Sequence, residues 1–138
     1  MPAAYDMKKS VACIIYDKEK VLIAHRNPTG QMGNRWEFPG GKVDQGETDK
    51  DAAVREMKEE FDVDAEVLEK ITEASFVHNG EDFLLTAYMV KVSHDGTEKK
   101  YKLTEHSEYK WVNINEIPVD NFVDSDLLIY PDVKKYLS

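Results

Sequence analysis

Cysteine is almost absent from this sequence, which contains only Cys13. A single cysteine cannot form a disulfide within the chain, so we expect the protein to work in a reducing compartment. The run Val-Ala-Cys-Ile-Ile at positions 11–15 surrounds Cys13 with apolar neighbours. We therefore interpret Cys13 as a buried structural residue and not as a reactive one.

Basic residues are also scarce relative to acidic ones. Lysine and arginine together number 18, against 27 aspartates and glutamates, which gives a formal net charge of -9. This balance argues against a general nucleic-acid binder, which normally has a basic face, so no nucleic-acid partner is expected. A polyanionic substrate would be repelled unless metal cations lay between it and the protein. The charge therefore indicates a metal cofactor for any anionic substrate.

Long hydrophobic runs, repeats and linkers are missing as well. The apolar run at 11–15 is too short for a membrane span or a signal-peptide core, so we expect a cytoplasmic protein with no membrane partner. No stretch rich in proline, glycine or serine divides the 138 residues, and we expect a single domain over 1–138. The four histidines show no zinc-ligand spacing, and His106 is expected in a loop. The sequence gives no basis for choosing an oligomeric state.

The pattern of apolar and polar residues predicts strands before and after one acidic helix. The elements expected before the helix are a hairpin of strands at 10–16 and 20–25, an irregular loop at 26–35, a short strand at 36–38 and a turn at 39–41. Residues 48–61 predict the helix, with Thr48 as its N-cap and Asp49 and Asp51 in its first turn.

The second half of the chain predicts a long hairpin and a final helix. Its elements are strands at 64–77 and 82–92 joined by an Asn-Gly turn within 78–81, a polar loop at 93–100, a strand at 109–114, and a helix at 122–137 that Pro131 should break or restart. Mixed strands with two helices in one short domain predict an α/β or α+β sandwich.

The helix at 48–61 carries an unusual arc of carboxylates. Its apolar residues share one stripe of the helical wheel: Ala53, Val54, Met57 and Phe61. Glu56, Glu59 and Glu60 border that stripe one turn apart, where like charges repel, and near the helix C-terminus, where the macrodipole disfavours anions. A solvated acidic face would explain a generic helix of this kind. A divalent cation would remove the conflict, because magnesium binds oxygen ligands, often one or two carboxylates.

The residues before and after this arc resemble the Nudix box. That box is Gly, five residues, Glu, seven residues, Arg-Glu, an aliphatic, any residue, Glu-Glu, any residue, Gly and an aliphatic. Eight of its nine specified positions match over 23 residues: Gly41, Glu47, Arg55, Glu56, Met57, Glu59, Glu60 and Val63. Asp62 stands where the family has a helix-ending glycine. Aspartate tolerates left-handed dihedrals at modest cost, so we expect Asp62 to threaten stability more than activity.

The resemblance implies a fold and a metal site. The fold is a Nudix-type α/β/α sandwich with a mixed sheet, and the cofactor is Mg²⁺, for which Mn²⁺ can substitute. The metal would bind the matching Glu56, Glu59 and Glu60, with the Gly41 backbone close to metal or phosphate. Glu47 and Arg55 match a pair whose salt bridge shapes the box loop.

Residues 34–42 resemble the segment that precedes the box in MutT-like members, which implies further site residues. Such enzymes supply a glutamate, as a metal ligand or base, from a late loop before a strand that begins with tryptophan, here Trp111. Glu105 occupies the matching place, Glu108 is the alternative, and either could be a plain surface acid. Arg26 matches an arginine that contacts phosphate. Catalytic roles are expected for Glu56, the first candidate for general base, and for Glu59 and Glu105.

The start of the last helix is expected to read the nucleobase, as in MutT-like enzymes. Asp126 is the best match and Asp124 the second, because a carboxylate can accept from base N–H groups or donate when protonated. These acids or Ser125 could instead simply cap the helix. Phe38 and Phe76 could stack on a base, although core packing is the more common role of such residues.

The implied activity is magnesium-dependent hydrolysis of a nucleoside triphosphate to a nucleoside monophosphate and pyrophosphate. The substrate would be a small-molecule nucleotide, either an oxidised purine nucleotide such as 8-oxo-dGTP or a cytidine nucleotide. Another nucleoside diphosphate-linked compound is an alternative within the family. An alternative of another class is a non-catalytic nucleotide-sensing module, against which the complete set of box acids argues.

Overall fold

Strand β1 (Lys8–Ile14) is the centre of the fold because both of its faces are buried. The computed structural model describes residues 7–28, 33–92 and 106–138, with only the backbone at 107. Val11 and Cys13 face one hydrophobic core, and Ala12 and Ile14 face the other. A strand buried on both sides has a continuous apolar run without alternation, as the sequence around Cys13 has.

Two sheets form the middle of the molecule. The first sheet has the order β5-β1-β7-β6, in which β1 and β7 are parallel and the other neighbours antiparallel. Its other strands are β5 (Gly40–Lys42), β6 (Ala65–His78) and β7 (Glu81–Val92). The second sheet contains β2 (Tyr16–Asp17), β3 (Lys20–Arg26), β4 (Trp36–Glu37) and β8 (His106–Asn113). The sheet containing β1 is therefore mixed.

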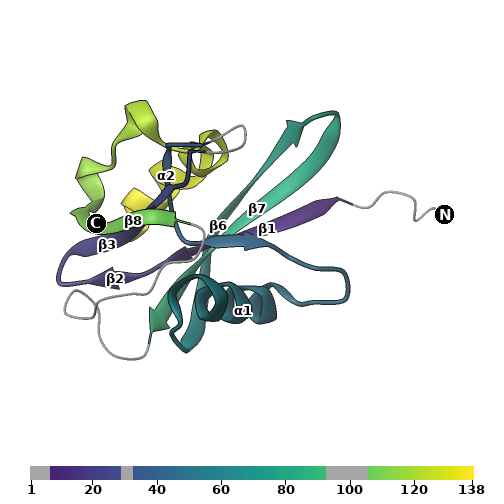
Figure 1. Cartoon of the computed structure of the whole chain (residues 1–138), viewed down its shortest axis with the longest axis horizontal. Coiled ribbons are helices and arrows are strands. Elements are labelled where there is room, and N and C mark those ends of the chain that lie inside the picture. The colour runs from purple at the N-terminus through teal and green to yellow at the C-terminus, as the bar shows by residue number, and fades with distance from the viewer. Residues whose placement is uncertain (1–6, 29–32, 93–105) are drawn as a thin grey trace.

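The two helices lie on opposite sides of these strands (Figure 1). Helix α1 (Asp49–Phe61) packs on the core that contains Val11 and Cys13, and α2 (Asp124–Tyr136) packs on the other core. Strand β3 alternates in the same way, because Leu22 joins the first core and Ile23 the second. This confirms the predicted α/β/α sandwich. Two short 3-10 helices, at Ile114–Glu116 and Val119–Asn121, precede α2.

Helix α1 begins and ends as the sequence predicts. The Thr48 hydroxyl accepts a hydrogen bond from the Asp51 amide at 3.1 Å. At the other end Asp62 adopts the left-handed conformation, with φ 54° and ψ 45°, and its amide donates to the Lys58 carbonyl at 3.0 Å. Aspartate thus takes the conformation that the family glycine would take, and the box keeps its helix end.

The long hairpin is also confirmed, while the first hairpin differs from the prediction. Asn79 and Gly80 have φ of 51° and 76°, as a two-residue turn between twisted strands requires. The segment predicted as one strand at 10–16 breaks at Ile15. Only its short second part, β2, pairs with β3, whereas β1 pairs with β5 and β7.

Three local predictions are wrong. Residues 39–41 are not a turn, because Gly40 and Gly41 lie in β5 and pair with β1. Pro131 does not break α2: it lies on the exposed side, where water can bind the carbonyl that loses its helical partner. Val54 is not part of the buried stripe, since 41% of it is exposed and Ala52 is buried instead.

None of the helices in the described ranges is both long and apolar enough to cross a membrane.

Candidate active site

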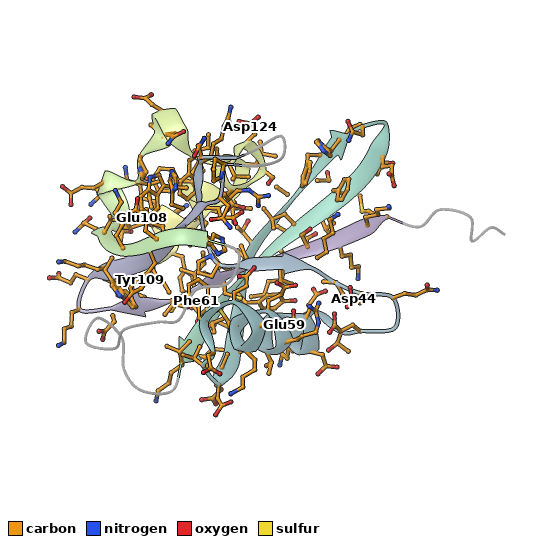
Figure 2. All side chains as sticks on the ribbon, in the orientation of Figure 1. Asp44, Glu59, Phe61, Glu108, Tyr109 and Asp124 are labelled. Atoms are coloured by element: carbon orange, nitrogen blue, oxygen red, sulfur yellow. The ribbon has the colours of Figure 1, made fainter. Side chains whose placement is uncertain are left out.

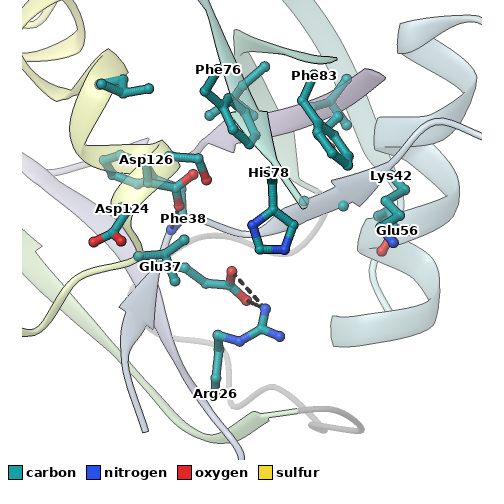
Figure 3. A pocket seen from close by; sticks show the side chains of 18 of the residues that line it. Arg26, Glu37, Phe38, Lys42, Glu56, Phe76, His78, Phe83, Asp124 and Asp126 are labelled. Carbon is teal, nitrogen blue, oxygen red and sulfur yellow. Dashed lines mark hydrogen bonds and ion pairs between the residues drawn. The ribbon is translucent and has the colours of Figure 1, made fainter. Parts of the chain in front are cut away.

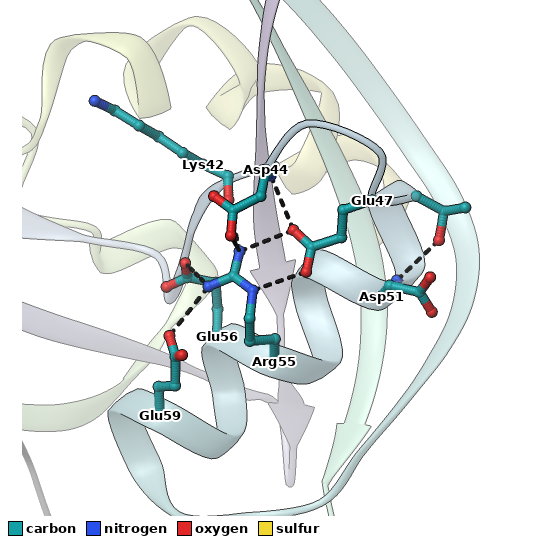
Figure 4. A network of polar contacts seen from close by, with 8 residues as sticks. Lys42, Asp44, Glu47, Asp51, Arg55, Glu56 and Glu59 are labelled. Carbon is teal, nitrogen blue, oxygen red and sulfur yellow. Dashed lines mark hydrogen bonds and ion pairs between the residues drawn. The ribbon is translucent and has the colours of Figure 1, made fainter.

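Arg55 organises the loop that leads into α1 (Figure 4). Its Nε donates to Glu47 Oε2 at 2.7 Å and its Nη2 to Glu47 Oε1 at 2.9 Å, a bidentate pair. Nη2 also donates to the Lys42 carbonyl at 3.0 Å. The hydrogen bonds from Arg55 lower the pKa of Glu47 to about 2, so Glu47 remains ionised. The contact implied by the Nudix resemblance is thus present in the structure.

The third nitrogen of Arg55 contacts the carboxylate arc. Arg55 Nη1 donates to Glu56 Oε1 at 2.9 Å and to Glu59 Oε1 at 3.0 Å. The side chain of Glu59 is 59% exposed, against 13% for Glu56. Asp44 lies beside the same guanidinium, at 3.5 Å from Nη2. Figure 2 shows Glu59 and Asp44 on the side of the molecule where α1 lies, away from Asp124.

Glu56 and Glu60 form a pair of neighbouring carboxylates. Glu60 is buried, and Glu56 beside it is half-buried. Burial raises the pKa of Glu56, and the charge of Glu59 adds to the effect, while Arg55 and Glu60 oppose it through hydrogen bonds. Two carboxylates held together in a low-dielectric site strongly favour a proton or a cation between them.

The backbone at Gly41 lies against this pair. A Cβ at position 41 would be 2.6 Å from the carboxylate carbon of Glu56, so a side chain there would displace the acid. The structure therefore brings Gly41, Glu56 and Glu60 together, as predicted, on one wall of a cavity of about 960 Å³.

The cavity continues to a second group of polar residues, of which Arg26 and Glu37 are labelled in Figure 3. Arg26 donates through Nη1 to both oxygens of Glu37, at 3.2 and 3.3 Å. His106 Nε2 lies 2.8 Å from Glu37 Oε2. Arg26, Glu37 and His106 all line the cavity. The prediction that His106 lies in a loop is wrong, because it is buried at the start of β8 and stacks on Phe61.

Asp126 is buried in the wall of the same cavity. Its Oδ2 accepts a hydrogen bond from the Phe38 amide at 2.9 Å. Burial raises the pKa of Asp126 to about 8, and the nearby charge of Glu37 contributes, against weaker lowering by the Phe38 amide and Arg26. The alternative in which this carboxylate caps α2 is wrong, because Val123 is the N-cap and no side-chain capping bond forms there within the described residues.

The other residues predicted to contact the base are less buried than Asp126 or pack in the core. Asp124 is exposed at the cavity rim and accepts a hydrogen bond from Arg35 at 2.8 Å. The ring of Phe38 is buried, edge-on to Phe122 at 5.1 Å between centroids, which is a core role. Phe76 lines the cavity and stacks on Phe83.

The predicted metal ligands are not all brought together. Glu59 points to Arg55, and Glu105 lies outside the described residues. Over 7–28, 33–92 and 106–138, no three His, Cys, Asp or Glu side chains form a group that could hold a metal ion. Glu108 is exposed on β8 and is absent from the residues that line the cavity.

Glu37 and His106 are site residues that the sequence reasoning missed. A signal for Glu37 exists in the sequence, because an acid between Trp36 and Phe38 in a predicted strand must face either solvent or a polar partner. His106 had no such local signal, since its partner Glu37 is 69 positions away.

Asp126→Asn should change how stability depends on pH. The folded pKa of Asp126, about 8, exceeds the ordinary value of 3.8, so the stability that this group contributes is complete below about pH 4 and is lost as pH rises to about 8. Asparagine is neutral throughout, so the variant should gain on the wild type as pH rises across this window. Each unit of displaced pKa is worth about 1.4 kcal/mol, or roughly 3–5 °C in Tm.

Thermal unfolding of both proteins at pH 5, 6, 7 and 8 measures this effect, with the exposed Asp124→Asn as the control. A constant difference in Tm between Asp126→Asn and the wild type would show that Asp126 titrates as an ordinary carboxyl.

Comparison with known proteins identifies the family to which the chain is related. A model of the NUDIX domain matches residues 6–133. The chain is 34% identical over 110 residues to a CTP pyrophosphohydrolase of Escherichia coli K12, a match that covers 80% of this chain and 78% of the relative. It is 35% identical over 95 residues to an 8-oxo-dGTP diphosphatase of Proteus vulgaris, covering 68% and 80%. It is 30% identical over 118 residues to an RNA pyrophosphohydrolase of Sulfurovum sp., covering 85% and 71%.

The fold has close counterparts among solved structures. The solution structure of the E. coli ORF135 protein superposes with a TM-score of 0.81 at 26% sequence identity, covering 98% of this chain and 94% of the other. The domain match spans nearly the whole chain, and the box residues Glu47, Arg55 and Glu56 make the contacts described above. Taken together, the sequence match, the fold and the box geometry show that this chain belongs to the Nudix hydrolase family, whose members cleave phosphoanhydride bonds of nucleotides.

Proposed function

We propose that this chain is a magnesium-dependent nucleoside-triphosphate pyrophosphohydrolase that releases a nucleoside monophosphate and pyrophosphate. The observation that carries the proposal is one cavity lined both by Glu56 of α1 and by Asp126 of α2, which lie well apart in Figure 3. One end holds the carboxylates of Glu56 and Glu60, and the other holds the buried Asp126. The first end suits a cation with phosphate, and the second suits the polar edge of a base.

The acid end fits a magnesium ion. Magnesium commonly binds one or two carboxylates together with substrate phosphates and water, and Glu56 and Glu60 offer such a pair. The Gly41 backbone lies close to the Glu56 carboxylate, so its carbonyl is the candidate for a further oxygen ligand. When bound, the metal neutralises charge that develops on the phosphates and lowers the pKa of the attacking water. Glu59 and Glu105 remain candidates for additional ligands.

The residues of the chain itself would orient the substrate and accept a proton. Glu56 is our candidate for the general base, because it is held at the cavity wall by Arg55 and Glu60. Arg26 reaches the same cavity and would contact a phosphate while Glu37 holds its guanidinium. The net charge of -9 makes such cationic contacts necessary for a polyanion.

The far end of the cavity would select the base. Asp126 keeps one carboxyl oxygen on the Phe38 amide, which leaves the other for a base N–H or carbonyl. Relatives that act on CTP and on 8-oxo-dGTP support a cytidine or an oxidised purine nucleotide as the substrate. A relative that acts on RNA makes a 5′-triphosphate RNA a useful comparison substrate, although the acidic charge of this chain favours free nucleotides.

Turnover of single nucleotides with and without metal tests the proposal. CTP, GTP, 8-oxo-dGTP and a 5′-triphosphate RNA oligonucleotide are incubated with MgCl₂, and the products are separated by ion-exchange chromatography. We expect monophosphate and pyrophosphate in equal amounts, loss of at least about 100-fold in rate on exhaustive chelation with EDTA, and recovery with MgCl₂ or MnCl₂.

Two outcomes would contradict this function. Release of a diphosphate and inorganic phosphate would place the cut at another bond. Tight nucleotide binding without any turnover would support a sensing module instead.

A further inference from the structure

Residues 34–38 and 121–126 lie side by side although 87 to 89 positions separate the hydrogen-bonded residues. The Asn121 side chain donates to the Asn34 carbonyl at 3.0 Å. The Val123 amide donates to the Trp36 carbonyl at 2.9 Å. At the end of this contact the Phe38 amide donates to Asp126 at 2.9 Å. We call this pair of segments the clasp.

The clasp replaces the usual means of fixing a helix start. Helix α2 begins at Asp124, and its N-cap residue Val123 cannot accept a hydrogen bond through its side chain. The first turn of α2 is therefore held by strand β4 and the residues beside it. Because Asp126 lies in this first turn, its place in the cavity wall depends on the same contacts.

Arg35 makes the charged contact of the clasp. Its Nη1 donates to Asp124 Oδ1 at 2.8 Å and to the Phe122 carbonyl at 3.4 Å. The side chain of Arg35 is 38% exposed and that of Asp124 is 70% exposed. An exposed pair of this kind adds little to stability. Arg35 instead has a local structural effect. It binds both the backbone before α2 and the side chain of the first residue of the helix.

The same contact controls the charge at the cavity rim. Asp124 lines the cavity beside Asp126, as Figure 3 shows. Without a partner, the Asp124 carboxylate would stand as a free anion at the edge of the cavity proposed to bind an anionic nucleotide. Arg35 balances that charge and keeps the carboxylate turned towards the clasp.

We propose that Arg35 is a positioning residue for nucleotide selection, acting through Asp124 and the start of α2 on the carboxylate of Asp126. This inference rests on the proposed nucleoside-triphosphate hydrolysis. Arg35 is itself absent from the residues that line the cavity, so its role is to place the group that meets the base.

Steady-state kinetics of Arg35→Ala on the preferred nucleotide and on a poor one test the inference. We expect the ratio of the two kcat/KM values to fall by about three- to fivefold, mainly through a higher KM for the preferred nucleotide, with kcat nearly unchanged. Arg35→Lys, which keeps the charge but not the planar fork, should recover part of the preference. Asp126→Ala serves as the reference for full loss of the contact.

A matched control removes a different cation, on β8, that contacts the same segment. Lys110 lies over the ring of Trp36 at 4.3 Å, and Lys110→Ala should leave the preference ratio unchanged. Two results would overturn the inference. In one, Arg35→Ala lowers Tm and reduces kcat equally for both nucleotides. In the other, it changes neither KM nor the ratio of the kcat/KM values. Absence of turnover by the wild type would instead remove the proposed function, and this inference with it.

Discussion

Glu56→Gln and Glu60→Gln should each lower kcat by about 10²–10⁴-fold while the protein stays folded. Both changes keep the shape of the side chain and remove the negative charge that would hold a cation. The two acids are neighbours, and partial burial raises the pKa of Glu56. Without metal, an amide in place of either acid relieves this electrostatic conflict, so Tm should stay equal or rise.

Measured kcat with saturating MgCl₂, together with Tm and the circular dichroism spectrum, separates loss of function from loss of fold. Glu116→Gln, on an exposed glutamate of the 3-10 helix before α2, is the matched control and should behave as the wild type. Glu59→Gln tests the third acid of the arc, which contacts Arg55. Wild-type kcat in all three box variants would mean that the arc is only a solvated acidic surface.

Gly40→Ala should destabilise the protein by about 3 kcal/mol or more, which lowers Tm by roughly 10 °C or more. Gly40 has φ 138°, a conformation that residues with a Cβ rarely adopt. A Cβ at this position would lie 2.0 Å from the Val11 carbonyl oxygen of the neighbouring strand. That atom belongs to the backbone of the central strand β1, so neither partner can move without breaking the pairing of β5 with β1.

Alanine variants at two other glycines serve as controls for Gly40→Ala in thermal unfolding. Gly46→Ala also meets a positive φ, of 83°, but nothing lies within 4 Å of the added Cβ, so its cost should be only about 1 kcal/mol. Gly41→Ala would press on the end of the Glu56 side chain, which can move. This variant should therefore lose kcat while its Tm changes little. Equal losses of Tm for Gly40→Ala and Gly46→Ala would contradict the close packing of β5 on β1.

Features with local causes could be predicted from the sequence. Helix α1 follows from the Thr48 cap and the apolar spacing, and the turn at Asn79 and Gly80 follows from dihedrals that these residues favour. The helix end at Asp62 is also a local matter, since aspartate tolerates the left-handed conformation. The family resemblance is local too. It rests on the spacing of Glu47, Arg55 and the box glutamates, which all lie in one loop and one helix.

Features that depend on partners far along the chain were missed or only proposed. Residues 39–41 have the composition of a turn, but pairing with β1 makes Gly40 and Gly41 part of a strand. Pro131 stays inside α2 because packing of the helix on the core offsets one lost hydrogen bond at an exposed position.

The box, the acid arc on α1 and the family could be recognised from the sequence alone, because residues within one stretch of 23 carry them. The burial of individual acids, and the contacts that hold the cavity end proposed to select the base, depend on the fold. Glu60 is buried while Glu59 contacts Arg55, and Asp126 binds the Phe38 amide although 88 positions separate them. The reason is physical: burial and charge pairing depend on which chain segments meet across the sheet, and local spacing does not contain that information.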